Sequence, residues 1–363
     1  MKQSLFFRYF PVPRSLILGG TGLDISDLSV KFISLATSPN DYRVTDFGEA
    51  AIPVGVILGG KVINQDGLVK VLAEFKTKHN LQYVVASLPE EPAYLIRVKL
   101  PFMPANELRD SIELQLEEYI PLPAGEVVFD YEVFAHPLAE TGYYDLSVSI
   151  IPKNVLADYK QALEKAGLIP IALEIEAQSL ARSLVSAGDK KTYLIVDIGK
   201  TRTGFCVVSR GIVLFTATLG SIGGENLTTA IQKNLGITYN EAEKLKLAKG
   251  LRHSAADKQV FEAIIPVVSI WRDEINRYRS YWETHKDDGE AKDKISGIII
   301  CGGQSSLPGL VDYLESNIGL SVTIGNPWTN VLEKNTTVPS IDFNNSLRYA
   351  TATGLALRNL IDP

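Results

Sequence analysis

The strongest candidate for chemistry is the stretch Asp197 to Thr203, Asp-Ile-Gly-Lys-Thr-Arg-Thr, which follows the apolar run 193–196. A glycine just after a strand lets the backbone approach a ligand closely, and the amides of the turn can then point at phosphate oxygens. An acid beside a phosphate requires a cation between them, and proteins hold Mg²⁺ through one or two carboxylates, water and nucleotide oxygens. The stretch therefore predicts a phosphate and magnesium site. A plain hairpin turn braced by the aspartate side chain is the alternative.

A second candidate is the glycine pair Gly302-Gly303, which lies between an apolar run ending at Cys301 and a helix predicted to begin near Pro308. Glycines at such a connection permit a flat group, such as a purine or a ribose, to lie against the backbone, and proline suits the first turn of a helix. The pair therefore predicts a nucleoside-binding turn. A tight strand-to-helix connection without a ligand is the alternative.

Two further patterns gain weight only from their order in the chain. Gly223, Gly224 and Glu225 open a predicted helix, and Glu243 and Lys246 lie on the helix that follows. A glycine pair before a helix and a charged helical face are by themselves structural or solvated features. In sequence with the two glycine turns, however, they indicate one composite ligand site.

The elements that must position these residues occur twice. Residues 22–35 and 193–208 each form an apolar strand, a tight polar turn and a second strand, and in each case an acid, Asp24 or Asp197, closes the first strand. Two such hairpins far apart in one chain predict an α/β protein built from two similar halves.

A segment of different character separates the two hairpins. A predicted helix at 106–120, alternating strands at 129–134 and 144–150, and a helix at 155–166 indicate a small α+β subdomain inserted in the first half. The predicted organisation is therefore a flexible leader 1–13, a first lobe 14–101 and 171–190, an inserted subdomain 102–170, a second lobe 191–225 and 296–363, and a helical part of the second lobe at 226–295.

Composition narrows the function classes. The 363 residues include 36 Lys and Arg against 42 Asp and Glu, a net charge of −6, which disfavours a nucleic-acid partner. The two cysteines, Cys206 and Cys301, each lie in an apolar run, so a thiol or metal chemistry is disfavoured as well. No stretch approaches the roughly 18 apolar residues of a membrane span, and we expect a cytoplasmic protein.

Taken in order, the Asp-x-Gly hairpin, the Gly-Gly-Glu helix, the Ala-Glu-x-x-Lys helix and the Gly-Gly-x-x-x-x-Pro-Gly turn resemble the nucleotide-binding fold of the actin and sugar-kinase superfamily. Within it, the segment from Leu100 to Leu122, followed by Asp130-Tyr131, is similar to the inserted subdomain of the PilM family of type IV pilus assembly proteins. The resemblance begins near Gly20 and implies a duplicated actin-like, ribonuclease H-like ATPase fold.

The resemblance also implies ATP and Mg²⁺ as cofactors, with Asp24 and Asp197 holding the metal through water. Glu176 falls near the place of a water-orienting catalytic residue in relatives, although an exposed acid at a helix start is the alternative. The nucleotide-binding positions that the resemblance implies are Asp24, Ser26, Asp27, Lys31, Asp197, Gly199, Thr203, Gly223, Gly224, Glu225, Glu243, Lys246, Gly302 and Gly303.

The first hairpin departs from the pattern of these relatives, which have Asp-x-Gly-Ser-x-x-x-Lys. Ser26 replaces the glycine, and a positive φ there would cost about 1–2 kcal/mol. Asp27 adds a negative charge near the expected phosphates, where it would repel by roughly 4 kcal/mol at about 4 Å, unless Lys31 or a cation intervenes or Asp27 braces the turn instead. We therefore expect ATP binding with slow or absent hydrolysis.

The function implied by the resemblance is a cytoplasmic ATP-binding scaffold of the pilus, secretion or competence assembly platform. It would lie beneath the inner membrane because it binds the cytoplasmic tail of a bitopic partner resembling PilN. The resemblance places the tail in a groove between the first lobe and the insertion, near Leu116 and Tyr119. It also implies that identical subunits can form a ring. The alternatives are a sugar- or acetate-kinase relative, for which Glu176 is the only candidate base, and a membrane-associated filament protein resembling FtsA, which would need an amphipathic C-terminal helix.

Overall fold

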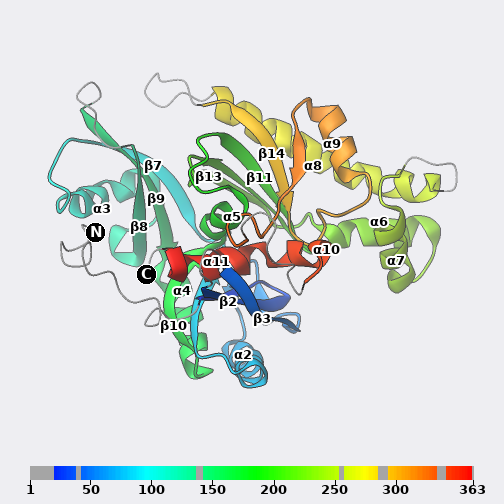
Figure 1. The fold of residues 1–363 in the computed structure, drawn as a ribbon, viewed down its shortest axis with the longest axis horizontal. Helices are drawn as coiled ribbons and strands as arrows, with labels where there is room; N and C mark the ends of the chain where they lie inside the picture. Colours follow the sequence, from blue (N-terminus) through cyan, green and yellow to red (C-terminus); the bar gives the residue numbers. More distant parts are fainter. Residues whose placement is uncertain are drawn as a thin grey trace.

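The computed structural model describes residues 20–37, 42–135, 142–252, 257–284, 293–332 and 341–361. The predicted leader 1–13 lies outside these ranges. Two five-stranded sheets form the centres of two lobes, and a three-stranded sheet stands beside them (Figure 1). The alternation of strands and helices predicted from the sequence is therefore observed in both halves.

The sheet of the first lobe has the strand order β10-β6-β1-β2-β3, and α2 and α4 pack on one of its faces. Alternate apolar side chains of the β1–β2 hairpin, such as Leu23 and Phe32, are fully buried against Leu68 and Leu72 of α2. The elements of this lobe are β1 (Gly20–Ile25), β2 (Ser29–Thr37), β3 (Tyr42–Ala51), β4 (Ile57–Leu58), β5 (Lys61–Val62), α2 (Gln65–His79), β6 (Tyr83–Leu88), α4 (Lys153–Lys165) and β10 (Ile169–Ile175).

The second lobe repeats this connectivity in the order β13-β12-β11-β14-β15. Strand β11 pairs antiparallel with β12 and parallel with β14, as β1 pairs antiparallel with β2 and parallel with β6, so the predicted duplication is confirmed. Its elements are β11 (Thr192–Ile198), β12 (Thr203–Ser209), β13 (Ile212–Leu219), α6 (Gly224–Leu235), α7 (Tyr239–Lys249), α8 (Lys258–Thr284), β14 (Ile295–Cys301), α9 (Leu310–Ile318) and β15 (Val322–Ile324).

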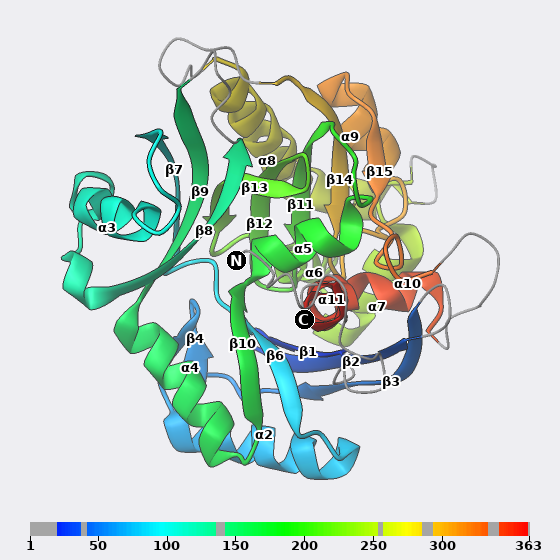
Figure 2. The same cartoon turned by 60° about the vertical axis from the view of Figure 1, so that its left-hand side comes forward.

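Two helices, α5 (Glu176–Leu184) and α11 (Ala350–Ile361), lie between the two sheets (Figure 2). Their backbones touch, because a Cβ on Gly354 of α11 would lie 1.8 Å from the carbonyl oxygen of Ser179. A Cβ on Gly22 of β1 would likewise meet the carbonyl oxygen of Ala352 at 2.0 Å. The prediction that 296–363 belongs to the second lobe is therefore wrong for α11, which packs on β1 and β2 of the first. The short α10 (Phe343–Ser346) and the 3-10 turn η3 (Leu347–Tyr349) precede it.

The inserted subdomain is a sheet of order β7-β9-β8 with α3 on one face. Its elements are β7 (Tyr94–Pro101), α3 (Leu108–Tyr119), the 3-10 turn η2 (Ala124–Glu126), β8 (Val127–Ala135) and β9 (Tyr143–Pro152). The predicted boundaries 102–170 are corrected at both ends. The sheet begins at 94, since β7 pairs with β9, and α4 belongs to the first lobe because its apolar face packs with α2. The spacing of apolar residues predicts where these helices and strands lie in the sequence but not which hydrophobic core each one packs into.

Among the helices of the described ranges, none combines the length and the apolar character needed to span a bilayer.

Candidate functional site

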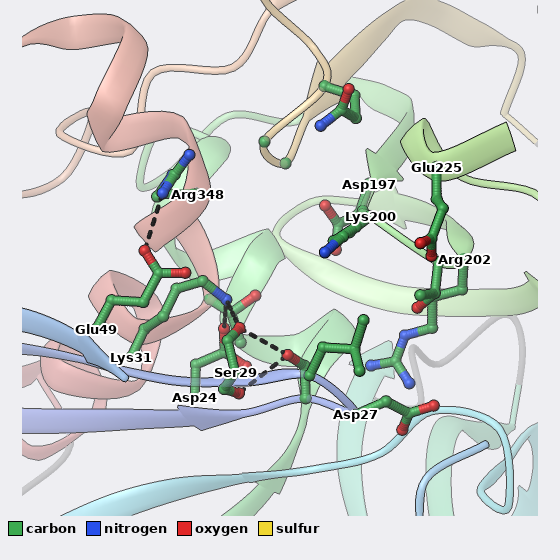
Figure 3. A pocket seen from close by; sticks show the side chains of 18 of the residues that line it. Asp24, Asp27, Ser29, Lys31, Glu49, Asp197, Lys200, Arg202, Glu225 and Arg348 are labelled. Carbon is green, nitrogen blue, oxygen red and sulfur yellow. Dashed lines mark hydrogen bonds and ion pairs between the residues drawn. The ribbon is translucent and has the colours of Figure 1, made fainter. Parts of the chain in front are cut away.

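A cleft of about 580 Å³ opens between the two lobes, where the β1–β2 and β11–β12 hairpins face each other (Figure 3). Asp24 and Asp197, distant in sequence, both line it. The predicted site residues that line this cleft are Asp24, Ser26, Asp27, Lys31, Glu176, Asp197, Gly199, Glu225, Glu243, Lys246, Gly302 and Gly303.

The first hairpin presents a carboxylate and an ammonium group as a pair. Asp24 is 6% exposed, and its Oδ2 lies 3.5 Å from Nζ of Lys31, which also donates to Oγ of Ser29 at 2.7 Å. The hydroxyl of Ser87, at the end of β6, lies 3.4 Å from Oδ1 of Asp24 and accepts from the amide of Ile25 at 2.8 Å. The parallel neighbour strand thus fixes the carboxylate at the sheet edge.

Ser26 and Asp27, the two residues of this hairpin that differ from the pattern of the relatives, have structural explanations. The described non-glycine residues with positive φ are Asn80 and Arg210, so Ser26 does not have the strained conformation considered above. The turn instead closes because the amide and the hydroxyl of Ser26 both donate to the carbonyl of Ser29. The carboxylate of Asp27 accepts the amides of Gly59 at 2.9 Å and Gly60 at 3.1 Å. Asp27 therefore braces a neighbouring turn of the first lobe.

The second hairpin holds Asp197 next to the glycine turn of β14. Asp197 lies opposite Cys301 in the parallel pair of β11 and β14, and burial raises its pKa while Lys31 and Arg202 oppose that rise. Gly302 has φ +83°, and a Cβ there would lie 2.2 Å from Oδ1 of Asp197. Glycine is therefore required at 302. At Gly303 a Cβ would meet its nearest neighbour, Arg348, only at 4.0 Å, which leaves that backbone open to a ligand.

Three predicted residues do not line the cleft but hold its wall. The hydroxyl of Thr203 donates to the carbonyl of Ile222 at 2.7 Å and accepts from the buried indole of Trp271 at 3.0 Å. The amide of Gly224 donates to the carbonyl of Gly199 at 3.0 Å, and a Cβ on Gly223 would meet the carbonyl oxygen of Lys200 at 2.6 Å. Thr203, Gly223 and Gly224 thus fasten the hairpin to the start of α6.

The charged pair on α7 is joined to the same helix start. The ammonium of Lys246 is buried and lies 2.8 Å from Oε2 of Glu243, 3.0 Å from the hydroxyl of Thr228 and 3.3 Å from the carbonyl of Gly224. Burial opposes ionisation of Glu243, but hydrogen bonds from Lys246 and Thr228 lower its pKa below the usual value. Glu243 remains ionised at the rim of the cleft.

Glu176 begins α5 and is tied to an arginine of the other lobe. Arg202 binds both its carboxylate oxygens, at 2.6 and 2.9 Å, and also pairs with Glu91, which follows β6. Burial, together with Asp24, raises the pKa of Glu176 despite Arg202. The buried carboxylate therefore lines the cleft as part of an ion-pair cluster between the lobes, and its role in orienting water stays a prediction.

Several residues that line the cleft were not predicted from the sequence. Arg348, before α11, pairs with Glu49 of β3 at 2.9 Å, and Lys200 and Tyr239 also line the cleft. The side-chain oxygen of Gln304 is buried without a hydrogen-bond partner. Lys200 and Gln304 directly follow the glycines of the two turns, and this position could have indicated them as candidate site residues. No local sequence pattern indicates the pairing of Arg348 with Glu49.

A second groove, of about 810 Å³, lies between the first lobe and the insertion. Leu116 is buried in the core of the insertion and Tyr119 is 46% exposed, and neither is among its lining residues. The groove is lined by Gly59, Lys61, Glu91, Pro92, Tyr94, Leu122, Gly125, Glu126, Pro152, Lys153, Asn154 and Val155.

Two lobes of one connectivity, with paired hairpins and a glycine turn around a shared cleft, define an actin-like ATPase fold. The family model described as type IV pilus assembly protein PilM matches residues 22–360. The chain therefore belongs to the PilM family.

Solved structures agree on the fold. A PilM-PilN type IV pilus biogenesis complex superposes with a TM-score of 0.79 and 24% identity, covering 96% of this chain and 100% of that one. EutJ of Carboxydothermus hydrogenoformans, an ethanolamine utilization protein, gives 0.55 at 15% identity over 96% of this chain and 91% of its own. An MreB of Spiroplasma citri bound to AMPPNP superposes with a TM-score of 0.55 and 11% identity, covering 94% of this chain and 96% of that one.

Among sequence relatives, the cell division protein FtsA of Enterococcus hirae is 29% identical over 188 residues, which are 48% of this chain and 42% of that protein. FtsA of Enterococcus faecalis is 28% identical over 190 residues, 47% and 43% of the two chains. The chain thus matches less than half the length of these relatives.

Proposed function

We propose that this protein is an ATP-binding scaffold of the type IV pilus assembly platform, held at the inner face of the cytoplasmic membrane by the tail of a partner resembling PilN. Membership of the PilM family supports the assembly role. The observation that carries the nucleotide role is the convergence of Asp24, Asp197 and the Gly302-Gly303 turn on one cleft.

The residues of the cleft fit a magnesium nucleotide. The glycine turn leaves room for a flat group at Gly303. The side-chain oxygen of Gln304 is buried without a hydrogen-bond partner and could accept a hydrogen bond from an amino group of a ligand. The volume of the cleft, about 580 Å³, is within the usual range for ligand sites. Asp24 and Asp197 would hold Mg²⁺ through water, and the metal would supply neutralising charge for the phosphates. A solved MreB neighbour is bound to AMPPNP and another to ADP, which supports a nucleotide here.

The second groove is our candidate for the partner tail. The solved neighbour most similar in fold among those above is a PilM-PilN complex, and the resemblance predicts a groove between the first lobe and the insertion. The apolar side chains of Tyr94, Leu122 and Val155 share that groove with Lys61 and Lys153. Because two glutamates also line the groove, its charges balance, and an amphipathic segment with apolar anchors and polar residues suits such a lining. A ring of identical subunits stays a prediction of the resemblance.

The two alternatives are less well supported. A kinase requires a free base near the acceptor hydroxyl, and the nominated Glu176 is bound to Arg202. The FtsA matches cover less than half of this chain, whereas the PilM family model covers residues 22–360. Pilus assembly is therefore the function we propose.

The test is a calorimetric titration of the full chain with a synthetic peptide of the partner's cytoplasmic tail. Tyr94→Ala removes an aromatic side chain of the groove, and Tyr131→Ala removes a comparable one that packs in the same insertion without lining it. We expect Tyr94→Ala to weaken binding at least tenfold and Tyr131→Ala to change it less than threefold. Equal effects, or no binding by the wild-type chain, would contradict the docking site.

A further inference from the structure

Among the described residues that line the cleft, Lys200 is the one cationic residue that forms no direct ion pair. It lies in the turn between β11 and β12 and is exposed. The other cationic side chains of the lining are paired: Lys31 with Asp24, Arg202 with Glu91 and Glu176, Lys246 with Glu243, and Arg348 with Glu49.

The lining as a whole has a surplus of acids. Among the residues that the structure describes, seven carboxylates and five cationic side chains line the cleft, and a polyphosphate would add further negative charge. The carboxylates are Asp24, Asp27, Glu49, Glu176, Asp197, Glu225 and Glu243. A magnesium ion would offset part of this charge, and Lys200 is the cation of the described lining that can bind a phosphate without breaking an existing ion pair.

The backbone of Lys200 is fixed while its side chain is free. Its carbonyl accepts the amide of Glu225 at 2.8 Å, and the preceding Gly199 donates to the carbonyl of Arg202 at 3.0 Å. Figure 3 shows Lys200 on the same wall of the cleft as Asp197 and Glu225, across from Asp24 and Lys31. Its charge also acts on α7, where it contributes to the lowered pKa of Glu243. The turn thus fixes the backbone of Lys200 in the cleft wall, and the flexible side chain carries the ammonium from there.

We propose that Lys200 binds the terminal phosphates and makes the cleft prefer nucleoside triphosphates to nucleosides and monophosphates. This role rests on the proposed nucleotide function. An ammonium group on a flexible stem acts on phosphate as a point charge, so its contribution should grow with the number of phosphates.

The experiment is a calorimetric titration of the full chain with ATP, ADP, AMP and adenosine in the presence of Mg²⁺. Lys200→Gln removes the charge, Lys200→Arg keeps it, and Lys244→Gln removes an exposed charge of α7 that does not line the cleft. We expect Lys200→Gln to weaken ATP binding about 10- to 100-fold, ADP binding less, and adenosine binding less than twofold. Lys200→Arg and Lys244→Gln should stay within threefold of wild type for every ligand.

Each contrary result has a distinct meaning. Unchanged ATP affinity in Lys200→Gln, or an equal loss for ATP and adenosine, overturns the phosphate role and leaves nucleotide binding intact. A wild-type chain that binds no adenine nucleotide overturns both the phosphate role and the proposed function. Because the side chain is exposed and forms no hydrogen bond or ion pair within the described structure, the thermal midpoint of Lys200→Gln should equal that of wild type, and Lys200→Arg provides a second comparison.

Discussion

Nη2 of Arg202 lies 2.6 Å from Oε1 of Glu176, and this contact joins the second-lobe hairpin to the first residue of α5. The same guanidinium pairs with Glu91, which follows β6 in the first lobe. Arg202 lines the cleft between the lobes, and Glu91 lines the groove beside the insertion. One ion-pair cluster therefore connects the candidate nucleotide cleft to the candidate partner groove.

Arg202→Gln should destabilise the protein, because it leaves Glu91 and Glu176 without their counter-ion in a largely buried place. We expect a loss of about 3–5 kcal/mol in the free energy of unfolding, measured by urea denaturation. Lys160→Gln, which breaks the exposed pair of Lys160 with Glu164 on α4, should cost less than about 0.5 kcal/mol. Similar losses in the two variants would mean that the cluster does not bind the lobes together.

Glu90 predicts a pH dependence of stability. Burial raises its pKa to about 7, although Thr216, the amide of Ala177 and Arg202 oppose that rise and Glu91 adds to it. The folded state therefore holds a proton that the unfolded chain releases near pH 4.5. The contribution of this proton to the free energy of unfolding is therefore complete below pH 4.5 and is lost as the pH rises through about 7.

We expect Glu90→Gln to flatten the stability profile between pH 5 and pH 8 and to raise the free energy of unfolding at pH 8 by about 1–3 kcal/mol. Denaturation at several pH values measures this. Glu118→Gln removes an exposed carboxylate of α3 and should leave the profile unchanged. A wild-type profile retained in Glu90→Gln would show that other groups cause the dependence.

Gly302→Ala should abolish nucleotide binding and destabilise the fold. The φ of +83° strains any L residue by about 1–2 kcal/mol, and the new Cβ would in addition collide with Asp197 and with the carbonyl of Ile198. Gly319→Ala is the matched control, because its φ is +71° but its Cβ would meet nothing within 4 Å. Both variants have the backbone strain of an alanine at positive φ, so calorimetry with ATP should show a loss of affinity in Gly302→Ala alone. Retained ATP binding in Gly302→Ala would show that this turn does not face the nucleotide.

ATP turnover by the wild-type chain should be slow, well below the roughly 1–10³ s⁻¹ of typical enzymes. The reason differs from that predicted from the sequence: Ser26 is unstrained, and the acid expected to orient water, Glu176, is held by Arg202. Phosphate release from ATP is the measurement. Rapid turnover that Asp197→Ala abolishes would contradict this prediction.

The parts of the site encoded by short local patterns could be predicted from the sequence. Asp24 and Asp197 were recognisable because an acid closing an apolar strand before a tight turn needs only a few neighbouring residues to be seen. Gly302 was recognisable for the same reason, since a double glycine between a strand and a helix is a local signal. The duplicated lobes followed from the repetition of such patterns, and the insertion followed from the different helix and strand periodicity between them.

The long-range contacts could not be predicted in this way. Arg202 and Glu91 are 111 residues apart, and nothing in the spacing of either indicates the other. The role of Asp27 depends on two amides of the Gly59-Gly60 turn, which only the folded chain brings beside it. The packing of α11 on the first lobe depends likewise on a close approach at Gly22 and Gly354 that periodicity does not reveal.

Calorimetric titration with ATP and Mg²⁺ of the wild-type chain, Asp24→Asn, Asp197→Asn and the exposed control Asp66→Asn tests most directly whether both hairpins bind one nucleotide. We expect one nucleotide per wild-type or Asp66→Asn chain and at least tenfold weaker binding in each of the other two variants. No heat with the wild-type chain, or wild-type affinity in either hairpin variant, would contradict it.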